Sequence, residues 1–134
     1  MTDESYQIKR AALQQIAGDS PIVFVGNAKA HIGSHIVHFR YCSENRTAPG
    51  KYKFNINPNT LSADLELWIC GAPQHFYLMP ISIIRGFYGH PEAYIDSYHP
   101  NIRIISVDAE QHRVTYARGG ISADLSQYFR ASLA

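Results

Sequence analysis

Cysteine, charge and long apolar runs are all scarce in this chain. Its 134 residues include two cysteines, Cys42 and Cys70, whereas secreted domains held together by disulfides usually carry more at this size. Charged residues make up 17% of the chain and the formal net charge is +1. This balance excludes a strong overall field for attracting nucleic acid but leaves room for a local basic patch. No apolar run reaches the length of a membrane span, so we expect no membrane partner.

Targeting segments and common enzyme signatures are also missing. The first residues are polar and acidic rather than those of a secretory signal peptide, and we expect a cytoplasmic protein with reduced thiols. The sequence has no nucleophile elbow, phosphate loop or dinucleotide-binding glycine pattern. Hydrophobic residues make up 46% of the chain, which is enough for a core and excludes disorder. The length fits one domain spanning residues 1–134.

The patterning of apolar residues predicts an α/β protein of the α+β type. Apolar residues at helical spacing predict an N-terminal helix over residues 4–17. Residues 34–80 contain four runs in which apolar and polar side chains alternate, with turn residues between them, which predicts a four-stranded antiparallel meander. The other expected elements are a strand at 21–25, a loop at 26–33, a covering helix at 81–88, a further strand pair at 102–107 and 113–117, and a C-terminal helix at 123–129.

The register of the meander can be predicted, because the apolar face and the turns must agree. Three pairings across the turns satisfy this requirement: Cys42 with Lys51, Asn57 with Ser62, and Cys70 with His75. They place every apolar position on one face of the sheet. The opposite face then carries two transverse polar rows: His38, Asn55 and Asp64 in one, and Arg40, Lys53 and Glu66 in the other.

The second face contains residues suited to phosphodiester chemistry. Asp64 and Glu66 lie two residues apart on one predicted strand, and Lys53 lies on the next. Carboxylate oxygens can hold Mg²⁺ and position a water, and a nearby cation can stabilise the developing charge. Alternatively, Lys53 and Glu66 form a cross-strand ion pair on a solvated face, which stabilises a sheet by about 0.2–1 kcal/mol. Both interpretations remain open at the level of sequence.

Three consecutive segments resemble small members of the PD-(D/E)XK nuclease-like group. They are Lys51-Tyr-Lys-Phe-Asn-Ile, Ala63-Asp-Leu-Glu-Leu-Trp-Ile and Phe76-Tyr-Leu-Met-Pro. In that group a strand bearing an aspartate is followed by a strand with a tyrosine, an apolar residue and a proline. The resemblance extends over about residues 4–85 and includes the order of an N-terminal helix, a strand meander and a further helix.

This resemblance implies an action on nucleic acid. It implies that Asp64 and Glu66 are the metal ligands, that Lys53 is catalytic with them, and that Mg²⁺ is the cofactor. The chain has no Pro-Asp followed by Glu-x-Lys or Asp-x-Lys, and Lys53 precedes the two acids. The resemblance therefore also fits a member without activity, and whether the chain is an enzyme stays open.

Binding of DNA or RNA without catalysis is a second interpretation. Basic residues crowd one end of the first predicted hairpin, and with two polar neighbours they form a candidate nucleic-acid contact: Arg40, Arg46, Lys51, Lys53, His38 and Asn55. Trp68 and Tyr77 share this face and would either stack on bases or, as favoured for Trp68, pack under the first helix.

A third interpretation is an interaction or oligomeric subunit domain. Three tyrosines expected at the surface, Tyr88, Tyr94 and Tyr98, suit a protein interface, and a homodimer is one form it can take. A metal site built from histidine has less support. His31 with His35, and Cys70 with His75, supply two ligands at a time, whereas zinc needs three or four.

Overall fold

The computed structural model describes residues 3–44 and 46–133. Its first sheet has the strand order β1 (Ile22–Val25), β2 (Lys29–Ile32), β3 (His35–Cys42), β5 (Leu65–Cys70) and β6 (Phe76–Pro80). Its second sheet has the order β10 (Ile121–Asp124), β9 (Arg113–Ala117), β8 (Arg103–Asp108) and β4 (Lys51–Ile56), and β7 (Tyr94–Ile95) also pairs with β8. The helices are α1 (Asp3–Ala17) and α2 (Ile81–Tyr88), with short 3₁₀ turns η1 (Pro58–Thr60) and η2 (Ser126–Tyr128). The predicted α+β class is confirmed.

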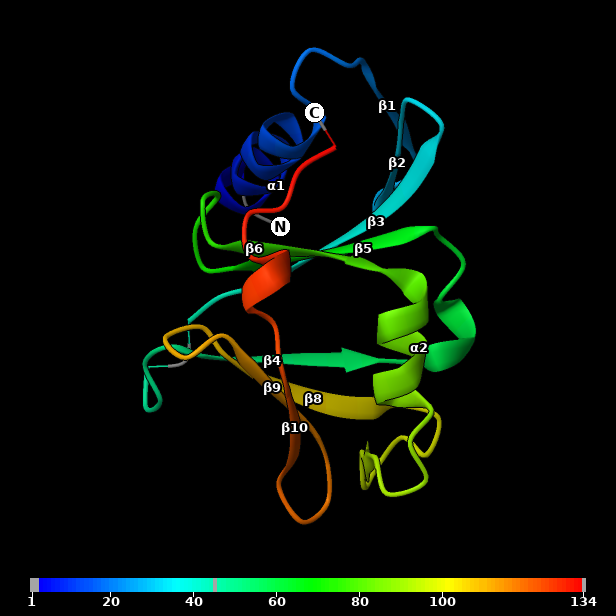
Figure 1. Cartoon of the computed structure of the whole chain (residues 1–134), viewed down its shortest axis with the longest axis vertical. Coiled ribbons are helices and arrows are strands. Elements are labelled where there is room, and N and C mark those ends of the chain that lie inside the picture. The colour runs from blue at the N-terminus through cyan, green and yellow to red at the C-terminus, as the bar shows by residue number, and fades with distance from the viewer. Residues whose placement is uncertain (1–2, 45, 134) are drawn as a thin grey trace.

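These elements form three layers, with the first sheet in the middle (Figure 1). Alternation along β5 explains the arrangement, because successive side chains of a strand point to opposite faces. Leu67 and Ile69 pack in a core with α1, whereas Trp68 and Cys70 pack in a second core with residues of the second sheet and α2. Strands β5 and β6 of the middle sheet are therefore buried on both faces, and α2 lies beside the two sheets (Figure 1).

The predicted antiparallel pairing of β3 with β4 and of β4 with β5 is wrong. Strand β3 instead pairs in parallel with β5, from Val37 opposite Leu65 to Cys42 opposite Cys70. Strand β4 crosses to the second sheet and pairs with β8. Alternation shows which side chains of a strand face a core, but it does not show which strand lies beside it. Strand β4 is therefore not hydrogen-bonded to β5. Its apolar side chains instead pack against those of β5 across the interior between the two sheets.

The remaining predicted elements are confirmed in part. The register of β5 with β6 is confirmed, with Ile69 opposite Phe76 and Leu67 opposite Leu78. Helix α2 and the β8–β9 pair occur where expected. The predicted loop at 26–33 contains β2, and the predicted C-terminal helix at 123–129 is wrong. Residues 121–124 extend the second sheet beside β9, and only a 3₁₀ turn follows.

Within the described residues, no helix is long and apolar enough to cross a membrane.

Candidate functional site

Four polar or aromatic side chains meet between the two sheets. Because β3 and β5 are neighbours, Arg40 and Glu66 come into direct contact, with Arg40 Nε 2.7 Å from Glu66 Oε1. The indole nitrogen of Trp68 donates to the same oxygen at 3.2 Å. His38 Nδ1 lies 3.2 Å from a guanidinium nitrogen of Arg40 and 3.7 Å from Glu66 Oε2. We call His38, Arg40, Glu66 and Trp68 the inter-sheet polar cluster.

The cluster is largely buried and internally paired, with Arg40 its most exposed member at 19% of its side chain. Glu66 and Trp68 are fully buried, and His38 is 8% exposed. Burial, then the charges of Arg40 and Lys29, lower the pKa of His38 to about 4, so the imidazole is neutral at pH 7. A neutral histidine and one matched ion pair leave no uncompensated charge. This arrangement favours a structural role, because a buried charge pair is stable only with its hydrogen bonds satisfied.

The three predicted catalytic residues do not share a site. Glu66 lies in the inter-sheet polar cluster. The carboxylate of Asp64 accepts a hydrogen bond from the backbone nitrogen of Ile36 at 2.9 Å, which fixes the start of β3. Lys53 is exposed on the second sheet opposite Ser106. The reason is the crossing of β4, which carries Lys53 away from the strand of the two acids.

The part of the chain that the structure describes offers no other metal centre in place of that site. Among residues 3–44 and 46–133, no three histidine, cysteine, aspartate or glutamate side chains come together in a way that could hold a metal ion. Both oxygens of Glu66 already accept from Arg40. The role of Asp64 and Glu66 as Mg²⁺ ligands therefore stays a prediction, without a ligand cluster to support it.

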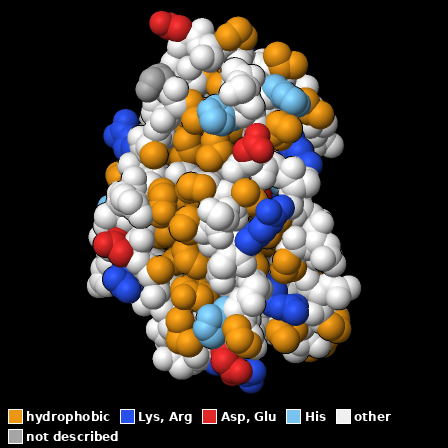
Figure 2. Space-filling model, turned by 45° about the vertical axis from the view of Figure 1, so that its right-hand side comes forward, with side chains coloured by type: hydrophobic (Ala, Val, Ile, Leu, Met, Phe, Trp, Pro, Cys, Tyr) orange, Lys and Arg blue, Asp and Glu red, His pale blue; other side chains and the backbone are white. Residues whose placement is uncertain are grey.

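The predicted nucleic-acid residues are divided between two places. His38 and Arg40 are in the interior, whereas Arg46, Lys51, Lys53 and Asn55 are exposed. On the side of the molecule shown in Figure 2, the Lys and Arg side chains are scattered and do not form a patch. The predicted basic cluster is thus reduced to the residues around the β3–β4 connection and β4.

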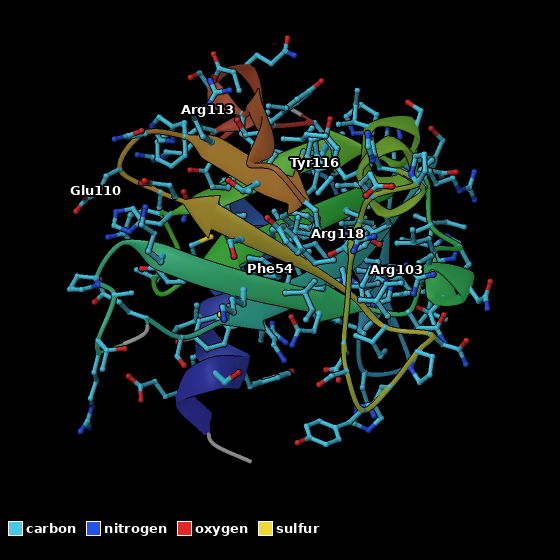
Figure 3. All side chains as sticks on the ribbon, turned by 90° about the horizontal axis from the view of Figure 1, so that it is seen from below. Phe54, Arg103, Glu110, Arg113, Tyr116 and Arg118 are labelled. Atoms are coloured by element: carbon cyan, nitrogen blue, oxygen red, sulfur yellow. The ribbon has the colours of Figure 1, made fainter. Side chains whose placement is uncertain are left out.

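The outer face of the second sheet is polar and nearly neutral. One row across all four strands alternates in charge, with each residue opposite the next: Lys51, Asp108, Arg113 and Asp124. Lys51 Nζ lies 2.5 Å from Asp108 Oδ2, and hydrogen bonds from Lys51 and from backbone N–H groups lower the pKa of Asp108. Figure 3 shows this open face from below, with Arg113 and Glu110 labelled at the β8–β9 end. The adjacent row contains Lys53 and small hydroxyl residues, so this face has little net charge.

Three aromatic residues expected at a binding face are buried. Trp68 stacks on Phe54 of the second sheet, with ring centroids 4.7 Å apart, and so it packs neither under α1 nor on a base. Tyr77 is fully buried and its hydroxyl lies 2.7 Å from His112 Nδ1. Tyr88 donates to the carbonyl of Phe54 at 2.9 Å. Base stacking by Trp68 or Tyr77 is therefore excluded, and Tyr88 cannot serve a surface interface.

A groove between α1 and β1 hollows the described surface and was not predicted. Its volume is about 560 Å³, and a second hollow of about 500 Å³ that shares Arg10 and Phe24 continues it toward the end of α1. Tyr6, Lys9 and Arg10 form its helix side, and Phe24 and Phe39 form its sheet side. We call this feature the α1–β1 groove.

Exposed apolar side chains gather beside this groove. Six large hydrophobic residues of the described chain are exposed, and four of them lie on α1 and β1: Tyr6, Val23, Phe24 and Val25. Val23 is the most exposed of the four, at 59%. Strand β1 pairs with β2 only, so it forms the edge of the first sheet. Sequence reasoning missed this surface because a short apolar run such as residues 22–25 is typical of a buried strand.

Comparisons with known proteins give no information about the function of this chain. No family model, no curated protein and no solved structure matches the chain. The fold and its surface therefore define an α+β protein with two sheets, an internal ion pair and one apolar sheet edge.

Proposed function

We propose that this chain is a protein-interaction domain that binds an extended segment of another protein along β1. The observation that carries the proposal is the concentration of exposed apolar side chains at one open strand edge. Soluble proteins rarely leave such a patch uncovered without a binding role.

The edge lacks the usual protection against strand pairing. Natural edge strands are commonly blocked by lysine, by proline or by a covering element, whereas β1 consists of Ile22, Val23, Phe24 and Val25. An added strand would hydrogen-bond to the outward backbone groups of β1, and its alternate side chains would pack on the two faces of the sheet. Phe24 offers an apolar contact on the α1 face, and Val23 and Val25 offer one on the other face.

The test is the selection of short peptides from a random displayed library against the purified chain. We expect enriched peptides that perturb the backbone amide signals of residues 22–25 in NMR spectra and protect these amides from hydrogen exchange. Val23→Lys should abolish binding, because a lysine on the edge disfavours strand addition. Ile95→Lys is the matched control, since Ile95 lies on a strand elsewhere and is 53% exposed.

Two results would contradict this proposal. One is the absence of any enriched peptide. The other is a set of peptides whose signals map to strand β7 around Ile95 and whose binding survives Val23→Lys.

A further inference from the structure

We infer that the segment bound at β1 is acidic and places a large apolar side chain in the α1–β1 groove. This inference rests on the proposed function and specifies the chemistry of its partner. It follows from the juxtaposition of two cations, Lys9 and Arg10, with the exposed edge residues of β1.

Arg10 is held in the groove wall by aromatic rings. Its guanidinium carbon lies 5.7 Å from the ring centroid of Tyr6 and 5.5 Å from that of Phe24. One guanidinium nitrogen donates to the Tyr6 hydroxyl at 3.1 Å. Because these contacts fix the side chain, less conformational entropy is lost when its remaining N–H groups bind an acceptor.

The charge of the groove is not balanced by the described chain. Neither Lys9 nor Arg10 forms an ion pair with a carboxylate of the described residues. The residues that line the groove and its continuation include these two cations and no aspartate or glutamate. Both cations are only partly exposed, so a carboxylate placed here would interact with them more strongly than at an open surface.

The dimensions of the groove fit a short extended segment. Tyr6, Arg10 and Gln14 lie on the groove side of α1, and the eight helical steps from the first to the last span about 12 Å. About four residues of extended chain cover that length, which is the length of β1. Two side chains of such a segment would point toward α1, one for the cations and one for the apolar floor.

The apolar floor suits an aromatic side chain. Phe24 and Phe39 are arranged edge to face, with ring centroids 6.1 Å apart. The volume of about 560 Å³ lies within the range of pockets that enclose small molecules. A ring inserted here would contact Phe24 in the offset or edge-on geometries that aromatic pairs prefer.

A second copy of the chain is a poorer occupant of this edge. Antiparallel pairing of β1 with its own copy about a two-fold axis places both α1 helices on the same face of the joined sheet. The Lys9 and Arg10 side chains of the two copies would then face each other without a carboxylate between them. Charge complementarity therefore favours an acidic segment of a different protein.

The test uses short blocked peptides of one design, Thr-Val-Asp-Val-Phe-Thr, in which Asp and Phe are two residues apart and so share a face of the added strand, and counterparts with Asn or Lys in place of Asp. Fluorescence anisotropy measures their dissociation constants at low and high salt. We expect the Asp peptide to bind about tenfold more tightly than the Lys peptide, as one charge-assisted contact implies. High salt should reduce the difference. Replacing Phe by Thr should weaken binding of the Asp peptide.

Variants of the protein test whether Arg10 is responsible for the preference for the Asp peptide. Arg10→Gln should remove most of the preference for Asp, and Arg10→Lys should retain part of it because the charge remains. Arg118→Gln is the control, since Arg118 pairs with Glu92 at 3.3 Å, outside the groove. Circular dichroism confirms that each variant is folded.

The possible results of these measurements distinguish the acidic preference from strand addition itself. Equal binding of the Asp, Asn and Lys peptides, abolished by Val23→Lys, overturns the acidic preference and leaves strand addition intact. Absence of binding by every peptide overturns both proposals. Self-association of the chain that Val23→Lys abolishes, seen by sedimentation without peptide binding, identifies a second copy as the occupant and also overturns this inference.

Discussion

Trp68 and Glu66 lie two residues apart on the same strand, and both side chains are fully buried. The indole N–H of Trp68 donates to the Glu66 carboxylate oxygen that Arg40 also contacts. Side chains two apart on a strand share a face, so this carboxylate is held from its own strand and from the neighbouring one. The inter-sheet polar cluster thereby fixes the parallel pairing of β3 with β5.

Arg40→Met is expected to destabilise the fold strongly. It leaves the buried Glu66 carboxylate without its cation, and loss of one partner of a buried pair typically costs about 3–5 kcal/mol of unfolding free energy. The same substitution should cost much less in a Glu66→Gln background, because the neutral amide can still accept from Trp68. Urea unfolding of the two single variants and the double variant measures the difference. Additive losses would show that Arg40 and Glu66 act independently.

Stability should fall as the pH decreases from about 6.5 to about 4. The pKa of His38 is lowered to about 4 in the folded chain, whereas an unfolded histidine titrates near 6.5. The unfolded state therefore binds this proton first, and the stabilisation present above pH 6.5 is lost as the pH falls toward 4. The unfolding free energy lost through protonation of His38 is at most about 3 kcal/mol.

Thermal or urea unfolding across that pH range provides the measurement. His38→Asn keeps an oxygen acceptor near Arg40 and removes the titration. This variant should show a flatter profile between pH 6.5 and 4, and an unchanged profile would assign the effect to another group.

Gly71→Ala is expected to cost more stability than Gly119→Ala. Both glycines have positive φ, +81° and +86°, where a Cβ adds about 1–2 kcal/mol of backbone strain. At Gly71 the added Cβ would lie 2.9 Å from the Tyr52 hydroxyl oxygen, whereas at Gly119 it meets no atom within 4 Å. The difference should shrink in a Tyr52→Phe background, which removes that oxygen. Denaturant unfolding of these variants tests the contact, and a difference that persists without the hydroxyl would refute it.

Nucleic-acid binding is a separate prediction that centres on Lys53. Lys53 is exposed and forms no ion pair with a described carboxylate, whereas the charge of Lys51 is offset by Asp108. Lys53→Gln should therefore weaken a salt-sensitive mobility shift of DNA or RNA more than Lys51→Gln does. Absence of any shift at low salt would eliminate this function.

Phosphodiester hydrolysis is tested in the same samples by adding Mg²⁺ or Mn²⁺. If Asp64 binds the metal, Asp64→Asn should abolish cleavage. Cleavage that survives this change would place any activity elsewhere in the chain.

The alternation of side chains predicted correctly which residues face a core. Tyr52, Phe54 and Ile56 are all buried, as their spacing indicates. Their position opposite Trp68 could not be predicted, because the partner of β4 lies about fifty residues later, at Lys51 opposite Asp108. Pairing between distant strands depends on the packing of the whole interior and not on local pattern.

The candidate site was harder to predict for a related reason. The spacing places His38, Arg40 and Glu66 on one polar face, but their burial depends on the second sheet covering that face. The α1–β1 groove arises where α1 meets the flank of β1, and nothing in the local sequence distinguishes the exposed Val23 from a core valine. Strand β2, residues 29–32, is short and lies between Gly26 and Gly33. Because glycines typically mark turns and loops, the sequence predicts a loop here instead of a strand.

The crossing of β4 between β3 and β5 has a consequence for folding kinetics. The two strands of the parallel pair at the centre of the first sheet are joined by a segment that contributes β4 to the second sheet. Neither sheet is continuous in sequence, so neither is an independent folding unit. Such non-local topologies belong to the slower folders, with folding times of about milliseconds to seconds. The amides of β4 and β5 should therefore become exposed to exchange in one cooperative opening, although they lie in different sheets.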